Sequence, residues 1–532
     1  MPESAKGDLS LNRSEVWLLA GLFCVALLIR LPNLLLVPRF EDEGIEVLWA
    51  LEIAKGHILP LSGSDAYYGP LFSYLVAGTF KVLGPNILWP RLLAAVAGSL
   101  TVCVTYLLGR IVGGRHAGIV AAGLVLTSPM FVLFGSHFGW SNSLTPLLAT
   151  AAILALVVAF AQAQVGWAAT GGLLTGLMVQ SHPLSAVLVA GVIVWIVGRG
   201  PSRAWASHRV ILAWGAGSAL GYLPMLLMFA VRWTSVASEV RNQSYAFNPA
   251  NSIIDYLSRL PVLGTMLVQM VAGVGSQMWE AFKTARLLTL IAEVLAATSL
   301  AWALGSAALS RWARQRPGLG FLACVIAVSV VLLPLIVRLP QMRYLLPLLP
   351  AICVLAGALS AHLWRNDVHE ARGRRVVWLW RSGVAAVVSV MVATNVFGIV
   401  RRTTQLLAEG ETNAPFLAMT EVVKRGQGCA TGVLVEDTDA LGWSRTDGGM
   451  VHFNTESVRY VLAMAPCPVL LRSAAQIEAA VAERDDVTWV VASTSTASAL
   501  SATLDLTPVQ PITPGPAVTP GRELQLYRAR RR

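Results

Sequence analysis

The chain has 532 residues, of which 55% are hydrophobic and only 13% are charged, and its mean hydropathy is +0.63. These values exclude an ordinary soluble globular protein. The net charge of +11 does not indicate nucleic-acid binding, because no basic stripe is interleaved with aromatic residues.

Apolar runs recur along the chain, and each is long enough to cross about 30 Å of hydrocarbon as a helix. We predict about eleven spans, and hence a polytopic α-helical membrane protein that carries a small C-terminal α/β domain. The first run is too long, and the chain after it too hydrophobic, for a cleaved signal peptide. The predicted spans are residues 16–37, 88–110, 117–135, 141–163, 166–181, 184–199, 209–231, 287–310, 319–338, 341–362 and 375–398.

Lys and Arg collect in alternate loops, which predicts a cytoplasmic N-terminus because basic loops stay inside. The basic residues of these loops are Lys6 and Arg13; Arg110 and Arg115; Arg199, Arg203 and Arg209; Arg311, Arg314 and Arg316; and Arg365, Arg372, Arg374 and Arg375. Arg401 and Arg402 run against the rule. In this orientation the external parts are the first connection, the turns at 136–140 and 181–183, the loop 232–286 and the C-terminal tail.

The first external connection, residues 38–87, opens with an acidic patch in a chain that has few acids. We interpret Glu41 and Glu46 as solvated flanking charges. Asp42 and Glu43 have two interpretations. One carboxylate can serve as a general base on an acceptor hydroxyl or amine, or hold a metal. Alternatively, the acids favour the N-terminus of a helix at 44–56. Their place at the hydrocarbon edge favours chemistry.

Two further features follow in this connection. The segment 44–56 mixes apolar and charged residues as a helix lying in the membrane interface does. The segment 71–83 predicts a second juxtamembrane helix or a re-entrant piece, and it comes directly after Gly69-Pro70.

Arginines stand at the external ends of other spans. Arg338 and Arg343 lie in a tight turn between two spans, and Arg91 opens the span 88–110. A guanidinium at that depth can form a bidentate pair with a phosphate, or it can hold the helix end at the headgroups. We favour donor-phosphate binding for Arg343, and the same choice stays open for Arg338 and Arg91.

Polar and aromatic residues mark the remaining external turns. Such residues at membrane depth usually face a protein interior or a wet cavity, although a lone histidine is more often structural than a ligand. Their spacing is not that of a metal site. We expect a substrate cavity lined by Tyr67, Tyr68, His137, Trp140, Asn142 and His182.

From about residue 403 the hydrophobic runs shorten and charges return, which divides the chain into domains 1–402 and 403–532. Strand-like pieces at 431–435, 468–472 and 487–493 alternate with helix-like pieces at 454–464, 474–483 and 496–504. This order predicts an α/β domain with a partly parallel sheet. Residues 506–521 look like a loop before a last strand at 522–528. Whether Cys429 and Cys467 form a disulfide stays open.

The chain has no phosphate-binding Gly-Lys-Ser/Thr loop, no dinucleotide Gly-x-Gly-x-x-Gly after a strand and no Cys-x-x-Cys. A soluble nucleotide-sugar donor or coupling to ATP therefore has no support in the sequence.

The order of several short motifs resembles the C-type (GT-C) glycosyltransferases over residues 15–400. The branch it resembles contains protein O-mannosyltransferases, lipid A aminoarabinose transferases and bacterial lipopolysaccharide glycosyltransferases. The motifs are Asp42-Glu43-Gly44, Tyr68-Gly69-Pro70-Leu71, Trp89-Pro90-Arg91-Leu92-Leu93, Gly172-Leu173-Leu174-Thr175-Gly176-Leu177, His182-Pro183 and Arg343-Tyr344-Leu345-Leu346-Pro347.

This resemblance implies a sugar donor carried on a polyprenyl phosphate and transfer with inversion on the external face. By position, Asp42 would be the catalytic carboxylate, Glu43 its partner and Arg343 a contact of the donor phosphate. We expect an enzyme of the bacterial inner membrane whose partners are this donor, the bilayer and a lipid, glycan or protein acceptor, with no nucleic acid. No cofactor is indicated with certainty, and a divalent metal stays open. The alternatives are a transporter or flippase of polyprenyl-linked glycans and a non-catalytic membrane subunit.

Overall fold

The computed structural model describes most of the chain, in a series of ranges separated by gaps. The described residues are 11–32, 34, 41–63, 67–86, 88–133, 135–198, 207–242, 249–272, 290, 293–294, 296–297, 305, 317–337, 342–364, 374–408, 433–436, 469–483, 488–511 and 524–532.

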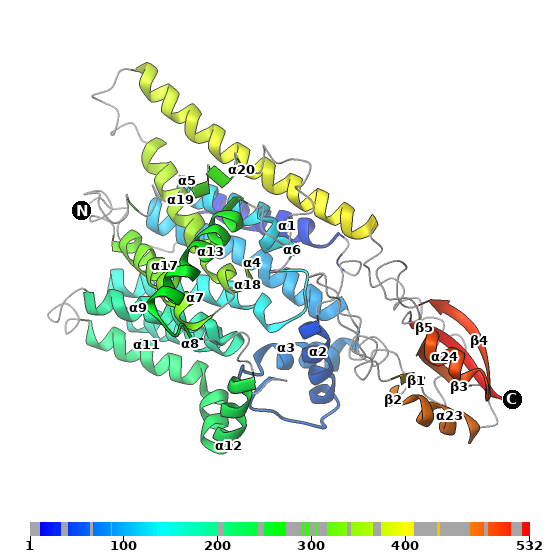
Figure 1. The fold of residues 1–532 in the computed structure, drawn as a ribbon. Helices are drawn as coiled ribbons and strands as arrows, with labels where there is room; N and C mark the ends of the chain where they lie inside the picture. Colours follow the sequence, from blue (N-terminus) through cyan, green and yellow to red (C-terminus); the bar gives the residue numbers. More distant parts are fainter. Residues whose placement is uncertain are drawn as a thin grey trace.

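Helices make up the body of the molecule (Figure 1). The N-terminal helices are α1 (Arg13–Arg30), α2 (Glu41–Ala54), α3 (Leu71–Leu83), α4 (Leu88–Gly113), α5 (Arg115–Thr127), α6 (Pro129–Leu133), η2 (Ser141–Ser143), α7 (Thr145–Gln162), α8 (Val165–Ser181), η3 (Pro183–Ser185) and α9 (Ala186–Gly198). The later helices are α11 (His208–Gly221), α12 (Leu223–Asn242), α13 (Ile253–Ala272), α17 (Pro317–Ile336), α18 (Met342–Leu345), η7 (Leu346–Leu348), α19 (Leu349–Trp364) and α20 (Arg374–Ala408).

Five helices of the described chain are long and apolar enough to cross a membrane, and the bent pair α11 and α12 raises this number to six. Every predicted span except 287–310, which lies outside the described residues apart from isolated positions, coincides with helical structure. The protein is therefore a multi-pass membrane protein, and the count of eleven spans stays a prediction. Helix α1 ends at Arg30, before the predicted end at 37, and Pro32 lacks the N–H that a further turn of helix would need.

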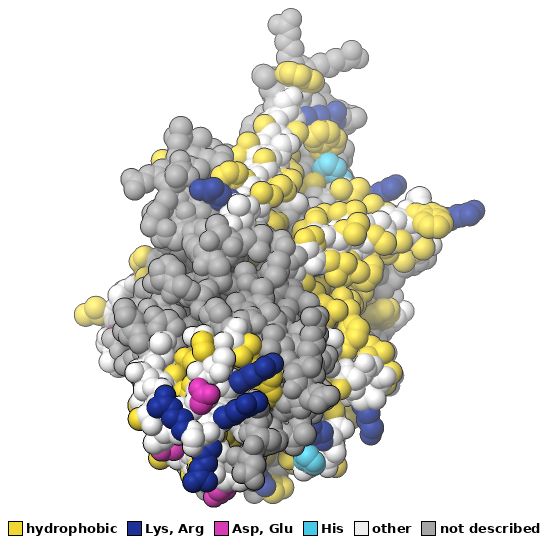
Figure 2. All heavy atoms as spheres, turned by 90° about the vertical axis from the view of Figure 1, so that its right-hand side faces the viewer, with side chains coloured by type: hydrophobic (Ala, Val, Ile, Leu, Met, Phe, Trp, Pro, Cys, Tyr) yellow, Lys and Arg dark blue, Asp and Glu magenta, His cyan; other side chains and the backbone are white. Residues whose placement is uncertain are grey.

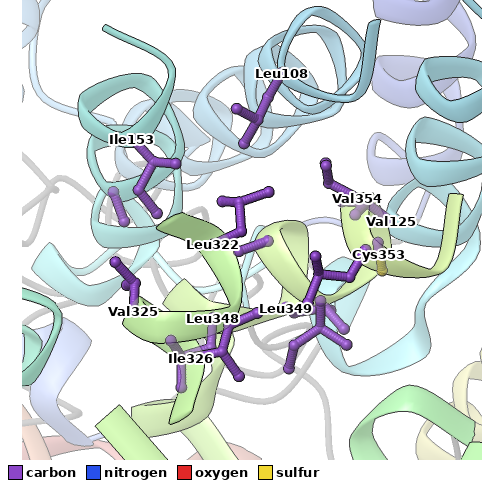
Figure 3. Close-up of a cluster of buried hydrophobic side chains, with 14 of the residues drawn as sticks. Leu108, Val125, Ile153, Leu322, Val325, Ile326, Leu348, Leu349, Cys353 and Val354 are labelled. Atoms are coloured by element: carbon purple, nitrogen blue, oxygen red, sulfur yellow. The ribbon is translucent and has the colours of Figure 1, made fainter. Parts of the chain in front are cut away.

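The helices pack around one large apolar core. Figure 3 shows side chains of α4, α5, α7, α17, η7 and α19 that point toward one another in its centre. Those labelled are Leu108, Val125, Ile153, Leu322, Val325, Ile326, Leu348, Leu349, Cys353 and Val354. This core fixes the helix ends that carry the polar residues of the candidate site.

Helices α8 and α11 pack against each other through glycines. A Cβ added at Gly172 would lie 2.1 Å from the carbonyl oxygen of Trp214, and one added at Gly217 would lie 2.3 Å from that of Ala169. Small residues at this spacing let two membrane helices approach backbone to backbone. The pair in turn holds Gln180, whose Nε2 donates to the Gly221 carbonyl oxygen at 2.8 Å.

The described parts of the predicted loop 232–286 are largely helical. Helix α12 extends to Asn242, and α13 covers Ile253–Ala272. The segment 71–83 is helix α3, so the prediction of a helix there is confirmed, and the helix predicted at 44–56 is α2.

A five-stranded mixed sheet forms the C-terminal part, with strand order β2-β1-β3-β5-β4. Its strands are β1 (Val433–Glu436), β2 (Val469–Arg472), β3 (Thr488–Ser493), β4 (Leu504–Pro511) and β5 (Leu524–Arg531), and its helices are α23 (Ala474–Ala482) and α24 (Thr494–Leu500). Strands β2, β1 and β3 are parallel, and β3, β5 and β4 pair antiparallel. The partly parallel sheet is confirmed.

The structure corrects two details there. Strand β4 begins at Leu504 and includes residues predicted as the loop 506–521. Helix α20 continues to Ala408, beyond the predicted boundary at 403. Cys429, Cys467 and the predicted helix 454–464 lie outside the described residues.

Figure 2 shows the side of the molecule that carries this sheet. Lys, Arg, Asp and Glu gather over the sheet, whereas the described helices present mainly hydrophobic side chains. Exposed arginines of β5 include Arg528, Arg530 and Arg531, while exposed helix residues include Trp17 and Leu212. An extended apolar surface of this kind suits contact with a membrane.

Candidate active site

Helix α2 places the acidic patch on a regular scaffold. The helix begins at Glu41, so Asp42 and Glu43 stand in its first turn, where the helix dipole stabilises negative charge. This agrees with the structural interpretation of the two acids and leaves room for the chemical one. The side chains of Glu41 and Asp42 lie outside the described part of the structure.

Glu43 forms a buried ion pair with Arg91 of α4. Arg91 Nε donates to Glu43 Oε1 at 2.7 Å, and Arg91 Nη2 donates to Oε2 at 2.8 Å, so the pair is bidentate. The two side chains are 0% and 1% exposed. Arg91 Nη1 also donates to the carbonyl oxygen of Leu34 at 2.6 Å. This arginine, predicted as a possible phosphate contact, is thus engaged by a carboxylate of the chain itself.

Glu46 is not the solvated charge that the sequence predicted, because its side chain is 3% exposed. The main-chain N–H of Ser141 donates to Glu46 Oε2 at 2.8 Å, and the Ser141 hydroxyl donates to Oε1 at 2.9 Å. Burial of a carboxylate requires such hydrogen bonds. Glu43 and Glu46 are three positions apart and share one helix face, which is the signal in the sequence that could have revealed a paired role.

These two acids hold the turn that leads from α6 to η2. Gly139 N–H donates to Glu43 Oε1 at 3.1 Å, beside the contact of Glu46 with Ser141. The turn also lies against the start of α4, because a Cβ at Gly139 would come 2.5 Å from the Cβ of Pro90. Helix α2, the start of α4 and this turn therefore form one connected unit.

His137 occupies the inner side of the turn. It is buried, and its Nδ1 lies 2.5 Å from the carbonyl oxygen of Val132. The pKa of His137 is lowered to about 4, mainly by burial; the charges of Arg30 and Arg91 also lower it, and hydrogen bonds to the main chain at Val132 and Pro32 act in the opposite direction. Arg30 Nε donates to the Ser136 hydroxyl at 3.0 Å. His137 is therefore a neutral structural residue at physiological pH, and Arg30 is a buried neighbour that the sequence reasoning did not single out.

Trp140 occupies the other side and meets Arg343 of α18. The Arg343 Cζ atom lies 5.3 Å from the ring centroid of Trp140 and 5.3 Å from that of Tyr344. The rings of His182 and Tyr344 are 5.3 Å apart between centroids. The structure thus brings together Trp140, His182 and Arg343, which the sequence placed in three different turns.

Tyr67 and Tyr68 lie at the same end of α8 as His182. The N–H of Gly69 donates to the carbonyl oxygen of Gln180 at 2.7 Å, which ties this segment to α8. The two tyrosine rings meet edge to face with centroids 5.2 Å apart. Asn142 lies in η2, next to Ser141, and is half-buried.

Two predicted features are not described at the side-chain level. Arg338 lies outside the described residues, and the same holds for the carboxylate of Asp42. Among the side chains that are described, no group of three or more His, Cys, Asp or Glu residues could hold a metal ion. The described carboxylates of the acidic patch instead bind an arginine and main-chain N–H groups.

Comparison with known proteins supports the resemblance. The model of the dolichyl-phosphate-mannose-protein mannosyltransferase family matches residues 68–229. No curated protein sequence matches the chain.

Solved structures match over most of the chain. The structure of ArnT from Cupriavidus metallidurans bound to undecaprenyl phosphate is similar with a TM-score of 0.59 at 14% identity, over 96% of this chain and 98% of that one. The Archaeoglobus fulgidus oligosaccharyltransferase in its apo form is similar with a TM-score of 0.50 at 10% identity, over 90% of this chain and 70% of that one. The chain has the fold of the C-type glycosyltransferases, and the resemblance seen in the sequence is confirmed.

Proposed function

We propose that this protein is a membrane glycosyltransferase that moves a sugar from a polyprenyl-phosphate donor to a lipid, glycan or protein acceptor, with inversion. The observation that carries this proposal is the buried bidentate pair between Glu43 and Arg91 directly beside Asp42. This ion pair fixes the helical turn that carries Asp42, and position is the first requirement of a general base.

In the proposed step, an acceptor hydroxyl or amine attacks the anomeric carbon as the bond from that carbon to the phosphate oxygen breaks. Asp42 takes the acceptor proton, and the polyprenyl phosphate leaves with the electron pair. Glu43 is assigned the role of partner, because Arg91 and Gly139 already occupy both of its oxygens. A single displacement of this kind inverts the anomeric configuration.

The departing phosphate needs a positive charge close to where its own charge develops. Arg343 is our candidate, since its guanidinium lies near two aromatic rings, and a guanidinium can form two parallel hydrogen bonds with a phosphate. The similar ArnT structure is bound to undecaprenyl phosphate, which supports a lipid-phosphate donor for this chain as well.

We place the site on the external face of a bacterial inner membrane, with a cytoplasmic N-terminus and the region 403–532 in the periplasm. This placement follows from the distribution of Lys and Arg among the loops and from the acidic first connection. Residues 1–402 would carry the transferase activity.

The test measures sugar transfer in membranes that contain the wild type, Asp42→Asn, Glu43→Gln or the control Glu41→Gln, with a radiolabelled polyprenyl-phosphate sugar pool. We expect folded Asp42→Asn to lose acceptor labelling while the donor accumulates, and Glu41→Gln to retain labelling. Unchanged labelling in Asp42→Asn would refute its role as the base, and no labelling by the wild type with any such donor would refute the proposed function.

A further inference from the structure

We infer that Glu46 is a positioning residue that sets the location of Arg343 relative to Asp42. This inference rests on the proposed function, because it assigns a task within the same site. The residue lies one helical turn after Asp42 on α2.

The first link is the double hydrogen bond between Glu46 and Ser141. Both oxygens of the buried carboxylate accept from the same serine, one from its N–H at 2.8 Å and one from its hydroxyl at 2.9 Å. Two bonds to one residue fix an orientation as well as a distance. Ser141 is the first residue of η2, so Glu46 determines where the chain enters this turn of helix.

The second link is the aromatic ring of Trp140, the neighbour of Ser141. Trp140 is buried, and Arg343 Cζ lies 5.3 Å from its ring centroid. A guanidinium over an indole face is attracted by the ring quadrupole, most strongly where water is excluded. Displacement of Ser141 therefore moves the surface on which Arg343 rests.

A consequence is that α2 controls both ends of the proposed reaction. Asp42 sits in its first turn, and Glu46 holds the turn that supports Arg343. An error of about 1 Å in such a distance can cost about 100-fold in rate. The distance between the proposed base, Asp42, and the proposed phosphate contact, Arg343, is then set through Glu46 and not by Asp42 or Arg343 alone.

Chemically matched variants separate the hydrogen bonds from the charge. In Glu46→Gln the amide oxygen can accept from the Ser141 N–H while its NH₂ donates to the serine hydroxyl, so both bonds survive. Glu46→Leu removes both, and Ser141→Ala removes only the hydroxyl bond. The control is Glu52→Leu on the same helix, whose carboxylate is largely exposed and pairs with Lys55 and His57.

The experiment measures kcat and the donor KM of purified protein, together with binding of undecaprenyl phosphate and thermal unfolding. We expect Glu46→Leu to raise the donor KM at least about tenfold and Ser141→Ala about threefold, with parallel losses of undecaprenyl phosphate affinity. Glu46→Gln and Glu52→Leu should retain wild-type values. In an Arg343→Gln background, Glu46→Leu should add little, because the supported side chain is already gone.

A purely structural role would lower the amount of folded protein and leave the donor KM of the folded fraction unchanged, and that result would overturn the inference. If Glu46→Leu does not fold, Ser141→Ala decides alone, and a wild-type donor KM there would overturn it. Fully additive effects of Glu46→Leu and Arg343→Gln would do the same. Failure of the proposed function is distinguishable, since the wild type would then transfer no sugar from a polyprenyl phosphate.

Discussion

Breaking the buried pair of Glu43 and Arg91 on one side should be among the most destabilising single changes in this part of the molecule. Removing Arg91 as Arg91→Gln leaves Glu43 buried with only the Gly139 N–H as a neighbouring donor among these contacts. Breaking a buried pair on one side costs about 3–5 kcal/mol, because the remaining charge is desolvated without compensation. We expect a loss of this size for Arg91→Gln and a similar one for Glu43→Gln.

The double variant Glu43→Gln/Arg91→Gln should lose much less than the sum of the two, because neither charge is then left alone. A coupling of about 2 kcal/mol is expected for residues in direct contact. The free energy of unfolding can be measured in mixed detergent and SDS micelles by the fluorescence of the 17 tryptophans.

A matched control lies on the same helix. Glu52 and Lys55 form an exposed pair at 3.2 Å, with side chains 42% and 47% exposed, and Glu52→Gln should cost no more than about 1 kcal/mol. Additive effects in the Glu43 and Arg91 cycle, or single losses no larger than that of Glu52→Gln, would refute the reasoning.

Three further predictions concern the other parts of the site and its support. The pKa of His137 is lowered to about 4, below its ordinary value of 6.5, so the unfolded chain binds more protons between these values and stability falls as the pH drops. From pH 7 to pH 5 the loss attributable to His137 should be about 2 kcal/mol, and a thermal unfolding series in which His137→Asn shows the same pH slope as the wild type would contradict this. Gly217→Ala places a Cβ 2.3 Å from the Ala169 carbonyl oxygen and should cost about 1–3 kcal/mol, measured in the same micelles. Gly215→Ala on the same helix meets nothing within 4 Å and should be neutral, so equal effects of the two would be inconsistent with close helix packing. Arg343→Lys keeps the charge but loses the planar fork, and we expect a donor KM about tenfold higher with unchanged unfolding temperature. A donor KM equal to that of the wild type would refute the role of Arg343 in binding the donor phosphate.

The local sequence pattern was sufficient to predict those structural elements that depend on residues close together in the chain. Apolar runs predicted the helical segments, because an isolated span satisfies its backbone hydrogen bonds within itself. The helix at 71–83 and a partly parallel sheet were predicted in this way. The acidic patch was recognised because acids are rare in this chain and the patch comes just after the first span.

Strand β4 shows why the same method failed elsewhere. Its prolines at 508 and 511 predicted a loop, since proline cannot donate to a sheet. Among the described strands, in the order β2-β1-β3-β5-β4, it lies at the edge and pairs with β5 alone, and an edge strand tolerates missing N–H donors. Its position in the sheet, which no short segment reveals, decided the outcome.

The sequence by itself determined that this is a membrane protein and which acids follow its first apolar run. Only the tertiary structure decided the partners of those acids. Glu43 meets Arg91 across 48 positions of sequence, and Glu46 meets Ser141 across 95. Such pairs form because the packing of the helices excludes water around them and leaves each buried charge to its nearest donor, and that packing is a property of the whole fold.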